Sequence, residues 1–114
     1  MPQAEREKCL VHVFVQYEEI FDEVLRICSC AVGGSIAVIE ANNASYYMDR
    51  LPLFSSFWED STRAFCRVIV AVVEKDMSND LLRRINVVAR KKKAETGVLL
   101  TVQELSVYSG SLEL

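Results

Sequence analysis

The chain has few residues that interrupt regular structure, with only four glycines and two prolines among 114 residues. This scarcity argues against a collagen-like, low-complexity or disordered polypeptide. No apolar stretch approaches the roughly 20 residues of a membrane-spanning helix, so we expect no membrane insertion. The net charge of -3 does not suit a nucleic-acid-binding surface. What is left is one folded domain over residues 1–114, large enough for a hydrophobic core.

The cysteines do not show the spacing of a disulfide scaffold. All of them lie inside apolar segments: Cys9, Cys28, Cys30 and Cys66. The polar residues 1–8 do not resemble a signal peptide, so we expect reduced thiols and a cytoplasmic location. Cys28 and Cys30, together with His12, are candidate ligands for copper or zinc. Residues two apart on a helix point about 200° from each other, so we predict no metal site unless the helix ends before Cys30.

Apolar periods predict an alternation of strands and helices. Strands are expected at residues 9–16, 35–41, 63–74 and 98–108, and helices at residues 17–31 and from Ser78 or Asn79 to the basic residues 90–93. The buried side of the second helix is expected to hold Leu81, Leu82, Ile85, Val88 and Ala89. This order predicts a ferredoxin-like α+β fold, an antiparallel βαββαβ sheet with the first and third strands central and both helices on one face.

The third strand predicts a sheet that is covered on both faces. After Arg67, residues 68–73 are apolar without alternation, although two helices can cover only one face. Leu10, His12 and Phe14 of the first strand would share the helix-free face. At ~25 cal/mol per Å², leaving such a surface wet costs on the order of several kcal/mol. We therefore expect copies of the same chain to cover it.

Two short stretches and one long connection carry a family resemblance. They are Gly33-Gly34-Ser35-Ile36 before the second strand, the basic run with Thr96-Gly97 before the last strand, and the connection at residues 42–62. Over residues 9–108 the chain resembles the PII-like signalling proteins, whose superfamily also contains the CutA proteins. It lacks the Gly-rich, Arg- and Tyr-bearing loop of the nitrogen regulators, and their Gly-Asp-Gly-Lys signature is reduced to Thr96-Gly97. The resemblance is therefore to the broad PII-like group and not to the nitrogen regulators.

The resemblance implies a homotrimer that binds an effector, commonly an adenine nucleotide, in clefts between subunits. The long loop would then engage a regulated target protein, such as a membrane transporter or an enzyme. The expected effector-binding residues are Gly33, Gly34, Ser35, Arg90, Lys91, Lys92, Lys93, Thr96 and Gly97. Cations can neutralise phosphates and a glycine lets a ligand approach the backbone. Equally, cations stabilise a helix C-terminus, and a glycine pair ends a helix.

The long connection is rich in aromatic side chains, which a solvated linker does not need. Its expected partner-binding residues are Tyr46, Tyr47, Arg50, Leu53, Phe54, Phe57 and Trp58. They either pack against the protein's own trimer or dock on a partner.

Enzymatic motifs are missing from the sequence. It has no Walker-type phosphate loop, no nucleophile motif and no metallohydrolase spacing of histidine and carboxylate. We therefore expect a trimeric regulator that binds a small anionic effector and is not an enzyme. The alternatives are a ligand-independent adaptor trimer and a CutA-like metal-binding trimer.

Overall fold

The computed structural model describes residues 7–32, 35–42, 65–110 and 112. Its elements follow in the order β1 (Lys8–Val15), α1 (Glu18–Val32), β2 (Ile36–Asn42), β3 (Phe65–Glu74), α4 (Lys75–Lys91), the 3-10 helix η1 (Glu95–Gly97) and β4 (Val98–Leu105). The predicted α+β class and βαββαβ order are confirmed.

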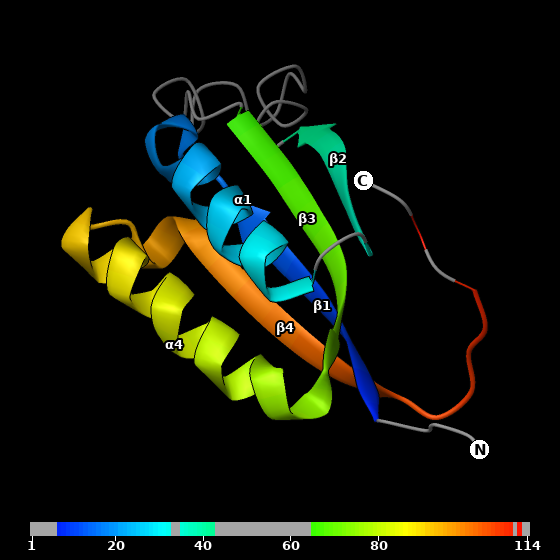
Figure 1. The fold of residues 1–114 in the computed structure, drawn as a ribbon. Coiled ribbons are helices and arrows are strands. Elements are labelled where there is room, and N and C mark those ends of the chain that lie inside the picture. The colour runs from blue at the N-terminus through cyan, green and yellow to red at the C-terminus, as the bar shows by residue number, and fades with distance from the viewer. Residues whose placement is uncertain (1–6, 33–34, 43–64, 111, 113–114) are drawn as a thin grey trace, which may run out of the picture.

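The strands form one antiparallel sheet in the order β2-β3-β1-β4, and both helices lie on the same face of it (Figure 1). As predicted, β1 and β3 occupy the centre. Val13 of β1 lies opposite Ile69 of β3 on one side and Leu100 of β4 on the other. Because opposed residues share a face, these registers fix which side chains point toward the helices.

The core lies between the sheet and the two helices. Alternate residues of β1 are buried there, and β3 contributes a matching set. The core side chains include Cys9, Val11, Val13, Val15, Ile20, Val24, Cys28, Ile69, Ala71, Val73, Leu81, Ile85 and Val88. Each large aliphatic side chain removed from water contributes about 1.5–3 kcal/mol. In α1 the buried positions Ile20, Val24 and Cys28 are four residues apart, which is the spacing of one helix face.

The start of α4 differs from the prediction. The helix begins at Lys75, directly after β3, rather than after a cap at Ser78 or Asn79. Glu74 is its extended N-cap residue and makes no side-chain capping bond. The hydroxyl of Ser78 lies inside the first turn, where it donates to the carbonyl of Lys75 at 2.8 Å. The strand therefore passes into the helix without a loop.

Two further predictions were wrong in detail. Leu82 is 38% exposed, because its neighbour Leu81 takes the core position and adjacent helix residues point about 100° apart. The last strand ends at Leu105 instead of Tyr108. Leu105 lies opposite Lys8, the first residue of β1, so the ladder ends where β1 offers no further partner.

An apolar row crosses the helix-free face of the sheet, as the sequence predicted. Phe14 of β1 lies opposite Val68 of β3 and Leu99 of β4, and Val68 lies opposite Ile39 of β2. The row thus takes one side chain from every strand. At its ends Ile39 is 51% and Leu99 58% exposed, and no helix of the described chain packs on this face. His12, one position along β1 on the same face, stacks with Phe14 at 6.4 Å between ring centroids.

Within the residues that the structure describes, no helix has the length and apolar character required to span a bilayer.

Candidate functional site

A cavity of about 280 Å³ lies where β1 ends and β4 begins, at one end of the helix-free face. We call it the Gly97 cavity. Its lining residues come from three strands, from η1 and from the residue that follows β1: Phe14, Gln16, Cys66, Thr96, Gly97, Val98 and Leu99. The structure thus places two of the predicted effector-binding residues, Thr96 and Gly97, in one concave site. Phe14, Cys66 and Gln16 were not predicted for it, because they are distant in sequence from Thr96 and Gly97.

Backbone hydrogen bonds hold η1 against the end of β1. The N–H of Gln16 donates to the carbonyl of Gly97 at 2.8 Å, and the N–H of Gly97 donates to the carbonyl of Ala94 at 3.0 Å. A Cβ atom at position 97 would lie 2.1 Å from Cε2 of Tyr17, far inside ordinary carbon contact. Packing against Tyr17 therefore accounts for the glycine without a ligand, while the backbone of Gly97 still lines the cavity.

The basic run closes α4. Arg90 and Lys91 lie in its last turn, and Lys92 is its C-cap residue. Lys93 has a φ of 56°, and the N–H of Ala94 then donates to the carbonyl of Ala89 at 2.7 Å. All four cations are exposed, and none has a carboxylate partner within the described ranges. They suit the helix C-terminus. None of them is among the described residues that line the Gly97 cavity, so the structure does not bring the predicted cations together with Thr96 and Gly97 in that lining.

Ser35 lies at the other end of the sheet. Its carbonyl accepts a hydrogen bond from the N–H of Val72 at 3.0 Å. Val72 is five residues along β3 from Arg67, which pairs with the last residue of β1. At ~3.4 Å per residue this separates the two ends by about 17 Å. A single chain thus does not bring Ser35 together with Thr96 and Gly97, and the predicted residues Gly33 and Gly34 lie outside the described residues.

The predicted partner-binding residues at positions 46–58 also lie outside the described residues. The structure does show where the connection between β2 and β3 is attached, because Asn42 and Phe65 are paired across the sheet. The ring of Phe65 packs edge-on against Phe21 at 6.0 Å, and the guanidinium carbon of Arg67 lies 4.6 Å from the centre of the Phe65 ring. Cys66, the next residue, lines the Gly97 cavity. The connection therefore rejoins the sheet beside this cavity.

The cysteine pair does not form a metal site in this geometry. Cys28 is buried in the core, whereas Cys30 is exposed, and α1 continues past both of them to Val32. Burial raises the pKa of the Cys28 thiol to about 11, which keeps it protonated. Metal-binding clusters of three or more ligands are not found within the part of the chain that the structure describes.

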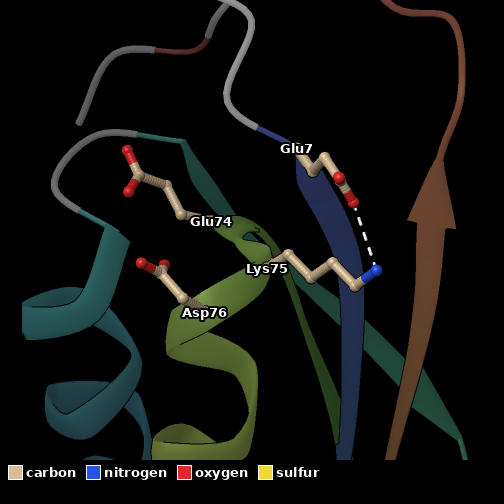
Figure 2. Close-up of a pocket in the computed structure, with 4 residues that line it drawn as sticks. All are labelled: Glu7, Glu74, Lys75 and Asp76. Carbon is tan, nitrogen blue, oxygen red and sulfur yellow. Dashed lines mark hydrogen bonds and ion pairs between the residues drawn. The ribbon is translucent and has the colours of Figure 1, made fainter.

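Sequence reasoning missed a charged cluster at the junction of β3 and α4 (Figure 2). The ammonium of Lys75 lies 3.1 Å from Glu7 and 3.2 Å from Glu104, and its backbone N–H donates to the carbonyl of Glu7. The hydrogen bond with Glu7, followed by that with Glu104, raises the pKa of Lys75. In Figure 2, Lys75 reaches toward Glu7, while Glu74 and Asp76 point the other way around a cavity of about 430 Å³. Lys75 is held by two carboxylates, and the other described lining residues are all acidic, so this cavity does not suit an anion.

Comparisons with known proteins establish the fold but no family. No family model matches the chain, and no curated protein matches its sequence. A Bacillus cereus protein related to NIF3 is similar in structure, with a TM-score of 0.57 and 15% identity, over 100% of this chain and 29% of that chain. A de novo designed protein, Foldit4, gives a TM-score of 0.41 at 16% identity, over 91% of this chain and 100% of that chain. At such identities the NIF3-related structure supports the α+β fold alone.

Proposed function

We propose that this protein is a PII-like regulatory module, not an enzyme, that binds a small anionic effector at the Gly97 cavity. The observation that supports this proposal is the position of Cys66. It lines the cavity and is the second residue of β3 after the long connection. A ligand in the cavity would therefore touch the attachment point of the segment that is proposed to engage a partner. The cytoplasmic location proposed for the protein agrees with its free cysteines.

The chemistry around the cavity favours a ligand with an apolar ring and an anionic group. Phe14 and Leu99 offer apolar surface, and Gln16 and Thr96 offer hydrogen-bonding groups. The cations of residues 90–93 precede Thr96 by a few positions and carry no ion pair in the described structure. An adenine nucleotide combines both features and is our first candidate. Ser35 is left out of this site, because it lies at the far end of the same sheet.

Self-association is the second part of the proposal. The exposed ends of the row, Ile39 and Leu99, would be covered by other copies of the chain, in the homotrimer that the PII-like resemblance implies. The Gly97 cavity borders this row, since it shares Phe14 and Leu99 with it. It would then lie at the boundary between neighbouring subunits. An effector would shift the connection between β2 and β3 toward one conformation only if the effector binds more tightly to the protein in that conformation. The connection would in turn control a target such as a transporter or an enzyme.

Calorimetry with AMP, ADP and ATP at millimolar concentration tests the effector site. The wild-type protein should bind at least one of them, and the double variant Lys91→Glu with Lys92→Glu should not. The matched control is Arg83→Glu with Arg84→Glu, which changes the net charge equally on the same helix but away from the Thr96–Gly97 turn. Absence of binding to the wild type, or undiminished binding to the Lys91/Lys92 variant, would contradict the proposal.

Analytical ultracentrifugation at micromolar concentration tests the assembly. We expect a trimer for the wild type and a shift to monomer for Leu99→Glu. Val87→Glu, on α4 at 50% exposure, is the control and should remain trimeric. A monomeric wild type would refute the assembly. A trimer that binds no nucleotide would favour the adaptor function in its place.

A further inference from the structure

A separate cavity of about 410 Å³ lies at the opposite end of the helix-free face, where the residues after β4 pass over the sheet. We call it the tail cavity. Val72 of β3 and Leu105 of β4 line it from the sheet, and Tyr108 and Leu112 line it from the tail. Its volume falls in the range of small-molecule sites, and it encloses more apolar than polar surface.

The tail reaches this position through a turn. After Leu105 the chain leaves the sheet and turns back toward β2 (Figure 1). Gly110 has a φ of +94°, a conformation that side chains disfavour, yet a Cβ atom there would meet nothing within 4 Å. The glycine is therefore required by the backbone turn and not by lack of space. The turn brings Leu112 to the same cavity as Val72, forty residues earlier in the chain.

Among the described lining residues of the tail cavity, polar groups come from Lys8, Ser35, Ser109 and the phenol of Tyr108, and the one charged group is a cation. The ammonium group of Lys8 supplies positive charge. Its ion pair with Glu74 spans 3.9 Å, at the outer limit of such contacts. Ser35 contributes a hydroxyl to the same lining. A loosely paired ammonium beside four apolar side chains suits a ligand with a hydrophobic body and one negative charge.

We infer that the tail cavity binds a small amphiphilic carboxylate with an aromatic or branched aliphatic body. The body packs between Val72 and Leu105 on the sheet and Tyr108 and Leu112 on the tail, and the carboxylate pairs with Lys8. This site is formed within a single chain, and it lies about 17 Å along the sheet from the Gly97 cavity at ~3.4 Å per residue. It therefore does not depend on the proposed nucleotide site.

Titration with indoleacetate, followed by assigned amide NMR spectra of the full chain, tests the inference. Ligands of this size reach dissociation constants on the order of 1 mM. We expect shifts concentrated at the amides of Val72, Leu105 and Tyr108. The uncharged analogue indoleacetamide should bind about tenfold more weakly. Shifts concentrated at Phe14 and Leu99, or no shifts at all, would overturn the site.

Variants test separately the charge of Lys8 and the enclosure of the ligand by the tail. Lys8→Met should weaken indoleacetate binding about tenfold, and Lys8→Arg should retain it. Arg26→Met, at an exposed cation on α1, should leave it unchanged. Gly110→Ala keeps every lining side chain but disfavours the turn, so it should also weaken binding. Equal affinity in the wild type, Lys8→Met and Gly110→Ala would refute the inference. The amide spectrum of each variant verifies that it is folded.

Discussion

Substitution of Gly97 by alanine tests the packing that positions the Thr96–Gly97 turn. The new Cβ would lie 2.1 Å from Cε2 and 2.5 Å from Cδ2 of Tyr17, whereas carbon atoms prefer about 3.5–4.0 Å. The ring must therefore move by more than about 1 Å, or η1 must move away from β1. Overpacking of this kind costs roughly 1–3 kcal/mol. For a domain of 114 residues, each 1 kcal/mol corresponds to about 4 °C in Tm.

Urea unfolding of a double-mutant cycle provides the measurement. Gly97→Ala should lower the free energy of unfolding in the wild-type background. In the Tyr17→Ala background, where the ring is gone, its cost should fall to a few tenths of a kcal/mol, giving a coupling energy of about 1–2 kcal/mol. Thr96→Ala, at an exposed neighbouring position, is the control and should stay within about 0.5 kcal/mol of the wild type. Equal costs of Gly97→Ala in both backgrounds would show that Tyr17 is not the reason for the glycine.

Three other outcomes follow from the burial of individual side chains. Ile85→Ala should cost about 2–5 kcal/mol in urea unfolding, while Leu82→Ala on the same helix should cost less than about 1 kcal/mol; similar values would contradict the helix phase. Because burial raises the pKa of Cys28 from 9.0 to about 11, the unfolded chain loses this proton first, so stability is retained below pH 9.0 and falls as the pH rises toward 11. Cys28→Ala should flatten this decline, and an unchanged slope would exclude Cys28 as its source. Ellman's reagent should label Cys30 rapidly in the native protein, and Cys9 and Cys28, which are at most 1% exposed, only after unfolding. Rapid native labelling that persists in the double variant Cys30→Ser with Cys66→Ser would disagree with the fold.

The alternation of side chains in β1 was sufficient to predict which residues of this strand enter the core. Val11, Val13 and Val15 point to the helices and Phe14 to the other face, because a strand in a sheet covered on one face has no other way to bury three valines. The start of α4 could not be predicted in this way. The junction between β3 and α4 depends on Glu7, which forms a hydrogen bond with Lys75 across 68 positions of sequence. No local capping signal in the sequence can predict such a contact. The end of β4 is likewise set by its partner, since the ladder ends where Lys8 begins β1.

The candidate site was only partly predictable for a related reason. Thr96 and Gly97 were identified from a local pattern, but Gln16 and Cys66 join them through strand pairing. The separation of Ser35 from Gly97 was available in principle, because β2 and β4 begin at opposite ends of a sheet with this strand order. Local motifs identify candidate residues, whereas the topology decides which of them can meet.

The order of the strands also affects how the polypeptide folds as it leaves the ribosome. The first strand to emerge, β1, has β3 and β4 as its neighbours, and β4 is completed only at Leu105. One edge of β1 therefore stays unpaired until almost the whole domain has been synthesised. Nascent chains of intermediate length should expose the valines of β1 and depend on chaperones, and the domain should fold late and in a single step.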